Sequence, residues 1–94
     1  MFNFDLSDLL KLKIRKLLRK DSKKGEIINK KIKEIINCNS TTIEHYKNLK
    51  YNMKDLKRFH IDKHFALSFK VYKKDNFILF LDFDHHNKIY KKYR

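Results

Sequence analysis

The hydrophobic residues of this 94-residue chain follow two different spacings, and the spacing changes near the middle. In the first half, apolar side chains recur every three or four residues, which is typical of a helix buried along one face. In the second half they alternate with polar residues, as in a β-strand. Residues 40–54 follow neither period, and we expect Tyr46 and Leu49 to enter the core from this irregular segment. The chain therefore predicts one α+β domain over residues 1–94.

Two amphipathic helices are predicted in the first half. The first begins after Ser7, a residue type that commonly caps helices, and ends within residues 21–25. The second ends near residues 37–39. The apolar stripes are Leu10, Ile14, Leu17 and Leu18 in the first helix, and Ile28, Ile32, Ile35 and Ile36 in the second. Because a short turn joins them, we expect an antiparallel helical hairpin.

Strands are predicted on both sides of this hairpin. Residues 2–5 form a short first strand, and residues 56–62, 65–72 and 77–83 form three strands with short connections. Such connections favour an antiparallel meander. Residues 87–91 are expected to add a final short strand. The predicted order is βααβββ, with the helices on one face of a mainly antiparallel sheet.

One face of this sheet is predicted to be polar. Arg58 and His60 point away from the core, opposite to Phe59 and Ile61. The neighbouring strand places Ala66, Ser68 and Lys70 on the same outer face. The alternation therefore predicts an uncovered, polar and basic surface on which RNA can lie.

The charge of the chain supports a polyanionic ligand. The formal net charge is +13, from 24 Lys and Arg against 11 Asp and Glu. Thirteen basic and six acidic side chains lie in residues 1–50, and eleven and five lie in residues 51–94, so the excess is spread over the domain. Such a field attracts nucleic acid, although an acidic protein partner and solubility alone are alternative interpretations.

Other features exclude several classes of protein. Cys38 is the only cysteine, so neither a disulfide framework nor a cysteine metal site is expected. The longest apolar run, Phe77–Leu81, is too short to span a bilayer, and no signal peptide is visible. A chain of this size leaves little room for a deep cofactor cavity. We expect a cytoplasmic protein without a cofactor.

Three segments in this order resemble toxins of the RelE/ParE superfamily, particularly archaeal and YafQ-like members. They are Leu56–Ile61, Phe65–Val71 and Asp84–Tyr90, and the likeness extends over essentially the whole chain. The resemblance implies a RelE-like fold and a toxin of a type II toxin–antitoxin system. It further implies a ribosome-dependent mRNA endoribonuclease that acts in the ribosomal A site and is neutralised by a RelB-like antitoxin.

The resemblance also implies metal-independent cleavage through the RNA 2′-hydroxyl, which needs a base, an acid and a cation near the phosphate. His86 matches the catalytic histidine of YafQ-like toxins and is expected to be the general acid. His60 matches a second family histidine, as base or phosphate contact. Arg58 is expected to clamp phosphate, and Tyr90 to stack on a base or orient the scissile phosphate. Which histidine is acid and which is base stays open.

Further residues are expected to contact RNA, namely Lys57, His64, Lys70 and Lys88. Lys11, Lys13 and Lys16 are expected in solvent, within reach of ribosomal RNA. Two positions depart from the family pattern. Ala66 stands where many RelE toxins have arginine, and Asp84 stands where many have a basic residue. A degenerate toxin is therefore one alternative.

Two other interpretations stay open. A non-catalytic basic binding module and a ParE-like gyrase inhibitor both fit the charge and the predicted fold. Imidazole and carboxylate groups that suit zinc or manganese are also close in sequence, at Asp82, Asp84, His85 and His86. However, adjacent histidines of a strand point to opposite faces, so no metal site is expected.

Overall fold

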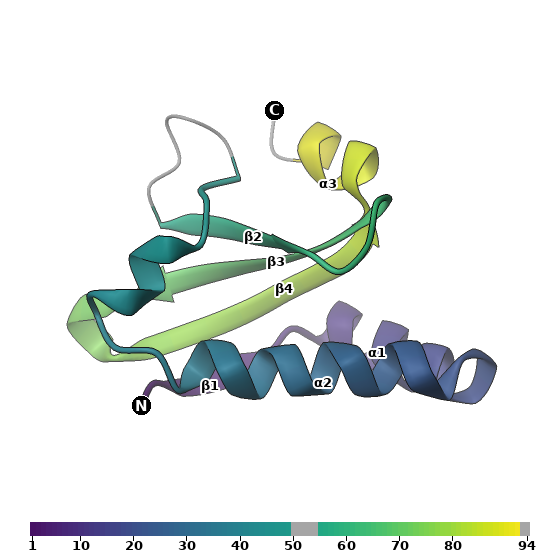
Figure 1. The fold of residues 1–94 in the computed structure, drawn as a ribbon, viewed down its shortest axis with the longest axis horizontal. Coiled ribbons are helices and arrows are strands. Elements are labelled where there is room, and N and C mark those ends of the chain that lie inside the picture. The colour runs from purple at the N-terminus through teal and green to yellow at the C-terminus, as the bar shows by residue number, and fades with distance from the viewer. Residues whose placement is uncertain (50–54, 93–94) are drawn as a thin grey trace.

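The computed structural model describes residues 1–49 and 55–92. Within them the elements are β1 (Asn3–Leu6), α1 (Asp8–Lys20), α2 (Ser22–Ile36), the 3-10 turn η1 (Thr42–His45), β2 (Leu56–His60), β3 (Phe65–Tyr72), the 3-10 turn η2 (Lys73–Asp75), β4 (Phe77–His85) and α3 (His86–Lys92). The predicted order βααβββ is confirmed, and a third helix follows it (Figure 1). None of the helices described is long and apolar enough to cross a membrane.

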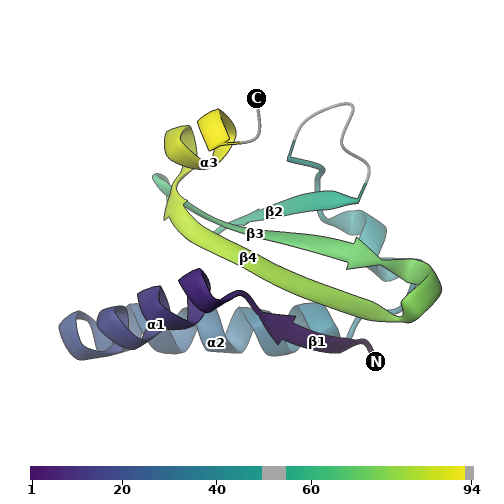
Figure 2. The same ribbon diagram turned by 180° about the vertical axis from the view of Figure 1, so that it is seen from behind.

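The four strands form one sheet in the order β1-β4-β3-β2. The pairs β2/β3 and β3/β4 are antiparallel, as the meander predicts, whereas β1 runs parallel to β4 along its other edge (Figure 2). The register shifts once, because Ser68 pairs with Asp82 but Phe69 pairs with Phe80. Leu81 is left as a bulge. Leu81 follows Phe80, which pairs with Leu6 at the end of β1. Past this point α1 lies beside β4 in place of β1.

Helices α1 and α2 cover one face of the sheet and bury the core against it (Figure 1). The predicted stripe of α2 is buried along its whole length, whereas the α1 stripe is buried only at Leu10 and Ile14, and Leu18 is 38% exposed. The sheet contributes buried apolar side chains from its two central strands: Leu67, Phe69, Val71, Ile78, Phe80 and Phe83. A single core therefore joins the hairpin to β3 and β4.

The ends of the first two helices are set by hydroxyl and carboxylate caps. Ser7 Oγ accepts a hydrogen bond from the Leu10 N–H, as predicted for an N-cap, and donates to the Leu81 carbonyl at the bulge. Helix α1 ends at Lys20 with Asp21 as its C-cap, at the start of the predicted window of residues 21–25, and α2 already begins at Ser22, so Gly25 lies within α2. A Cβ on Gly25 would come within 2.9 Å of Leu18 Cγ, so glycine permits the close approach of α1 and α2.

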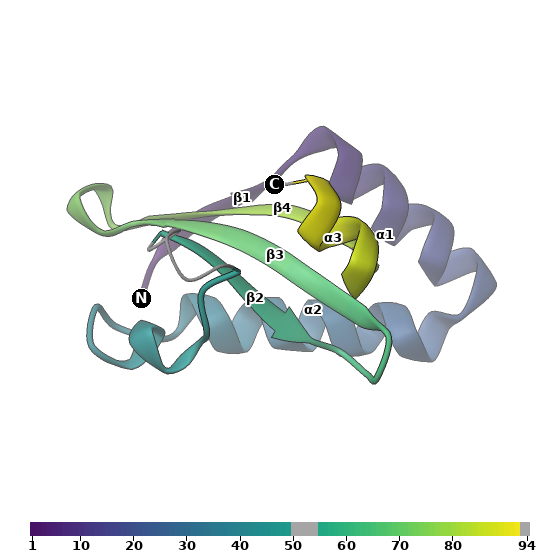
Figure 3. The same ribbon diagram turned by 90° about the horizontal axis from the view of Figure 1, so that it is seen from above.

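The prediction of a strand over residues 87–91 is wrong, because these residues belong to α3. Strand β3 begins at Phe65, which pairs with His85, so no β3 residue is left to pair beyond β4. The chain turns instead into a helix that buries Ile89 and lies on the face of the sheet opposite α1 and α2 (Figures 1 and 3). The outer face is therefore not uncovered as predicted: Ala66 and Ser68 are buried.

The predicted irregular segment 40–54 contains η1 and leads to the edge of β2. Leu49 is buried, and the half-buried Tyr46 ring packs edge-on against Phe59 and Phe69, so both enter the core as expected. Residues 50–54 of this segment lie outside the described residues.

Candidate active site

Four histidines meet where β2 and β4 end and α3 begins, and we refer to His60, His64, His85 and His86 as the histidine cluster. The ring centroids of His60 and His86 are 6.1 Å apart, and those of His85 and His86 are 4.6 Å apart. His64 stacks on His85 at 5.8 Å. Residues far apart in sequence are brought together because the antiparallel register places His60 opposite Ala66, and Ala66 opposite Asp84.

The ring of His86 is held by the backbone of the β2–β3 loop. The His64 carbonyl accepts a hydrogen bond from the His86 N–H at 2.7 Å, and His86 Nδ1 lies 3.0 Å from the same oxygen. Because a carbonyl only accepts, Nδ1 must carry a proton in this contact. The other nitrogen, Nε2, can therefore gain or release the second proton of the ring. This arrangement suits proton transfer at Nε2.

The two adjacent histidines do not point to opposite faces as predicted. Strand β4 ends at His85 and α3 begins at His86, so the alternation of a strand does not apply between them, and their rings stack. Across residues 1–49 and 55–92, no three His, Cys, Asp or Glu side chains are grouped so that they could hold a metal ion.

Arg58 and Tyr90 lie on the outer face beside the histidine cluster. The guanidinium carbon of Arg58 is 5.9 Å from the Tyr90 ring centroid, and that ring is 6.5 Å from His86 in an edge-on arrangement. Tyr90 is one helical turn after His86 on α3, which explains why both face this region. The structure thus brings together the predicted catalytic residues, which are Arg58, His60, His86 and Tyr90.

The electrostatics of this region favour a neutral His60. Partial desolvation lowers the pKa of His60 below its ordinary value, and the nearby charges of Arg58, His86 and Lys47 lower it further. Arg58 also has an unused donor: its Nε is buried and has no hydrogen-bond partner in the described part of the chain. A buried donor of this kind favours an anionic ligand at the guanidinium.

The residues predicted to contact RNA are spread over several places. Lys57 is only 2% exposed, and its ammonium donates to the Tyr46 carbonyl and Asn48 Oδ1, so it does not reach the outer face. His64 is exposed within the histidine cluster. Lys88 is exposed on α3. Lys70 is exposed farther along β3, with its ammonium 5.1 Å from the Tyr72 ring, toward the other end of the strand.

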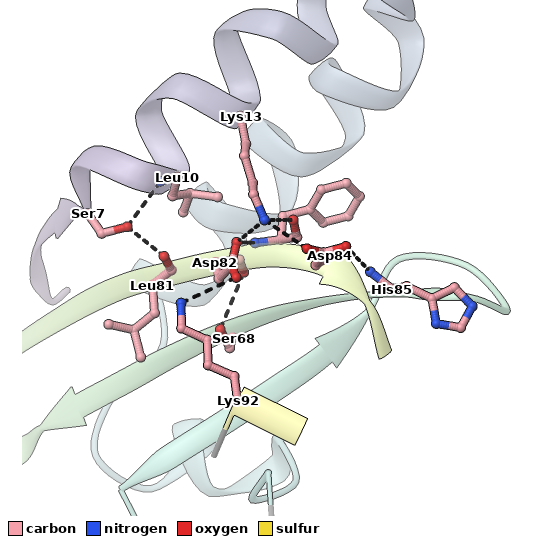
Figure 4. Close-up of polar contacts among 10 residues, drawn as sticks. Ser7, Leu10, Lys13, Ser68, Leu81, Asp82, Asp84, His85 and Lys92 are labelled. Atoms are coloured by element: carbon pink, nitrogen blue, oxygen red, sulfur yellow. Dashed lines mark hydrogen bonds and ion pairs between the residues drawn. The ribbon is translucent and has the colours of Figure 1, made fainter. Parts of the chain in front are cut away.

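A cluster of ion pairs on β4, absent from the sequence-based expectations, lies next to this site (Figure 4). Lys13 of α1, expected in solvent, donates to Asp82 at 2.7 Å and to Asp84 at 2.9 Å. Lys92 of α3 lies 3.5 Å from the other oxygen of Asp82. Asp82 is 4% exposed, so a nearly buried carboxylate joins α1 and α3 through β4. We refer to Lys13, Asp82, Asp84 and Lys92 as the β4 ion cluster.

The charges of the β4 ion cluster stabilise one another. Burial by itself opposes both charged forms, but hydrogen bonds and Coulomb attraction outweigh it. The pKa of Lys13 is therefore raised and the pKa of Asp84 is lowered from their ordinary values. Asp84, the position that departs from the family pattern, is thus paired with Lys13, which offsets its negative charge within the protein.

Comparison with known proteins identifies the family, although no family model matches the chain. A protein of Methanocaldococcus jannaschii named "Putative toxin RelE4" is 41% identical over 92 residues, which cover 98% of this chain and 94% of that protein. A protein of Methanosarcina mazei with no described function is 41% identical over 90 residues, covering 96% of this chain and all of the relative.

Solved structures agree on the fold. The Escherichia coli RelBE toxin–antitoxin complex matches with a TM-score of 0.70 at 20% identity, covering 90% of this chain and 96% of the matched one. YafQ from Escherichia coli strain BL21(DE3) matches with a TM-score of 0.68 at 16% identity, covering 95% and 98%. These similarities are low in sequence and show the fold alone. With the 41% identity to the archaeal relative, they establish that the chain belongs to the RelE family of toxins of toxin–antitoxin systems.

Proposed function

We propose that this toxin is a metal-independent endoribonuclease that cleaves mRNA in the ribosomal A site and so inhibits translation. The observation that carries the proposal is the pairing of His60 with His86, whose ring centroids are 6.1 Å apart. A guanidinium beside them, from Arg58, supplies the positive charge that phosphoryl transfer requires. This set matches the base, acid and cation of cleavage through the 2′-hydroxyl.

The geometry favours His60 as the base and His86 as the acid. The lowered pKa keeps His60 neutral near pH 7, so it can take the proton of the 2′-hydroxyl while the 2′-oxygen attacks the adjacent phosphorus. The bond from phosphorus to the 5′-oxygen breaks, and Nε2 of protonated His86 supplies the proton to that oxygen. The products are a 2′,3′-cyclic phosphate and a free 5′-hydroxyl.

The other two residues act on the phosphate and the base. Arg58 neutralises charge on the phosphate oxygens through its guanidinium group. Tyr90 stacks on a base or orients the scissile phosphate from α3, where its ring already lies against the Arg58 guanidinium. His64, Lys70 and Lys88 are exposed and supply further positive or polar surface for RNA.

We propose a RelB-like antitoxin as the protein partner in a cytoplasmic toxin–antitoxin complex. The net charge of +13 favours a partner that is acidic where it meets the toxin. The solved RelBE complex, to which this fold is similar, contains an antitoxin of that type. Covering the face that carries Arg58, His60 and His86 would block cleavage.

Induced expression followed by primer extension on a translated mRNA tests the proposed function. We expect cuts inside translated codons for the wild type, and cleavage reduced by about 10²- to 10⁴-fold for His60→Ala and His86→Ala. Lys74→Ala, an exposed lysine in η2, is the matched control and should leave the cuts unchanged. Growth arrest by the double histidine variant with intact mRNA would instead indicate a non-catalytic binding module or a ParE-like gyrase inhibitor.

A further inference from the structure

A hollow of about 360 Å³ opens beside the histidine cluster, where β2 meets the segment that is hydrogen-bonded to its outer edge. One wall comes from the last residue of η1 and the segment after it, and the other comes from β2. The lining residues are His45, Tyr46, Lys47, Arg58, Phe59 and His60. The two walls are joined by backbone hydrogen bonds, in which the Lys47 carbonyl accepts from the Arg58 N–H at 3.0 Å. The hollow therefore shares Arg58 and His60 with the candidate active site.

The chemistry of this hollow suits an anion. Among the residues that the structure describes, its lining includes Lys47 and Arg58 and no carboxylate. Lys47 is exposed, and its charge helps to lower the pKa of His60. The Nε of Arg58, buried and without a partner among the residues described, adds a donor that a phosphate oxygen can use. Since Arg58 also lies beside the histidines, an anion here would sit next to the phosphate that is cleaved.

The wall that carries Lys47 is fixed from inside by a buried ammonium. Lys57 Nζ donates to the Tyr46 carbonyl at 3.1 Å and to Asn48 Oδ1 at 3.0 Å, on either side of Lys47. Glu44 lies 3.5 Å from the same ammonium and pairs with Lys73 at 2.6 Å. A buried charge with several partners is costly to rearrange, so the wall is preorganised.

We propose that this hollow binds the RNA phosphodiester next to the scissile one, with Lys47 and Arg58 as its ligands and Lys57 as a positioning residue. The inference rests on the proposed function and adds a second phosphate site to it. It gives Lys57 an indirect role, because its ammonium holds residues 46–48 and does not reach the RNA.

Binding of short RNA analogues to the full chain tests this site. The probe is a trinucleotide with 2′-O-methyl sugars, which cannot be cleaved, together with two analogues that each carry one neutral methylphosphonate. For Lys47→Ala we expect the Kd of the trinucleotide to rise about tenfold, the effect of losing one charged hydrogen bond. The slope of log K against log salt should fall by about 0.7, the value for one phosphate contact to a single strand. Lys74→Ala should change the Kd less than about twofold, as a surface substitution away from the site.

The methylphosphonate analogues locate the contact. One analogue should bind the wild type about tenfold more weakly, and Lys47→Ala should weaken that analogue no further, because the interacting charge is already gone. Lys57→Met should weaken trinucleotide binding, and adding Lys47→Ala to it should cost less than in the wild type. A simple loss of stability would not produce this coupling, and Lys47→Ala tests the site even where Lys57→Met does not fold.

The outcomes separate the two proposals. Equal Kd values for Lys47→Ala and Lys74→Ala on the trinucleotide would overturn the second phosphate site while the histidine-dependent mRNA cuts still support the proposed function. An equal loss for Lys47→Ala on both methylphosphonate analogues would also overturn it. Wild-type protein that neither binds the trinucleotide nor cuts translated mRNA would overturn both.

Discussion

The two faces of the sheet bury side chains by different means. On the inner face, Phe69 and Phe80 are fully buried among apolar neighbours from α1 and α2, and no single direction is required of the contacts. On the outer face, Arg58, Ser68 and Asp82 form one row across three strands, each opposite the next. Each polar group there needs its own partner. The inner face therefore stabilises the fold, whereas the contacts on the outer face fix the orientation of polar side chains.

This difference explains why the candidate active site lies on the outer face of the sheet. Apolar side chains such as Phe69 and Phe80 can neither transfer a proton nor bind a phosphate, and the core-side ammonium of Lys57 is already held by the Tyr46 carbonyl and Asn48 Oδ1. Within the described residues, the short α3 covers the outer face, where Ile89 is buried beneath it and Lys92 pairs with Asp82. The histidine cluster lies at the end of β4 where this cover begins, which keeps its rings accessible.

Truncation on the inner face should have the largest effect on stability. Phe69 is fully buried and packs against the rings of Tyr46 and Phe80. Phe69→Ala should lower the free energy of unfolding by about 3–5 kcal/mol, through lost burial and the cavity left behind. Denaturant unfolding monitored by circular dichroism measures it. The exposed neighbour Lys70→Ala should stay within about 0.5 kcal/mol, and similar losses for both would contradict the contrast between the faces.

A smaller effect is expected when the charge of the β4 ion cluster is removed. Asp82→Asn keeps the size of the side chain but removes the negative charge closest to the Lys13 ammonium. Asp84 still pairs with that ammonium. We expect a loss of about 1.5–3 kcal/mol, the range for hydrogen bonds to charged groups. The mRNA cuts should weaken as well, because the ion pair between Lys92 of α3 and Asp82 of β4 is lost. Asp75→Asn, an exposed site in η2, is the control, and equal stability of the two variants would count against the cluster.

The sequence predicted the inner face well because burial there follows a period. Every isoleucine of the α2 stripe is buried, and Leu67, Phe69 and Val71 alternate as expected. The helix α3 was missed because seven residues cannot separate a helical period from a strand. The spacing of His86, Ile89 and Tyr90 fits one helical face. However, the end of β-pairing at His85 depends on the tertiary structure, which the local sequence does not show.

The candidate site was predicted where neighbours share one strand, and missed where partners are distant. Arg58 and His60 are on one side of β2 by alternation alone. The same alternation places Lys57 on the core side, with Phe59. The prediction that Lys57 contacts RNA rests on its charge and disregards this alternation. Nothing local links Lys13 to Asp82, because 69 positions separate them and only the fold brings them together.

The smallest expected effect is electrostatic and concerns His60 alone. Partial desolvation, then Arg58, His86 and Lys47, lower its pKa. Arg58→Met should therefore raise the His60 pKa toward its ordinary value, and Lys47→Ala should raise it by less. In both variants the acidic limb of the pH–rate profile of cleavage should move to higher pH, because more His60 is protonated and cannot act as a base.

The sign for stability follows from the same lowered pKa. The unfolded chain binds a proton to His60 more readily than the folded chain, so this contribution to stability is present above the unfolded pKa of about 6.5. It is lost as the pH falls through the lower pKa of the folded state. Titration of the His60 ring proton by nuclear magnetic resonance measures the shift in each variant. An unchanged pKa in both would mean that desolvation and His86 keep His60 neutral, and that Arg58 and Lys47 contact phosphates without changing the pKa of the base.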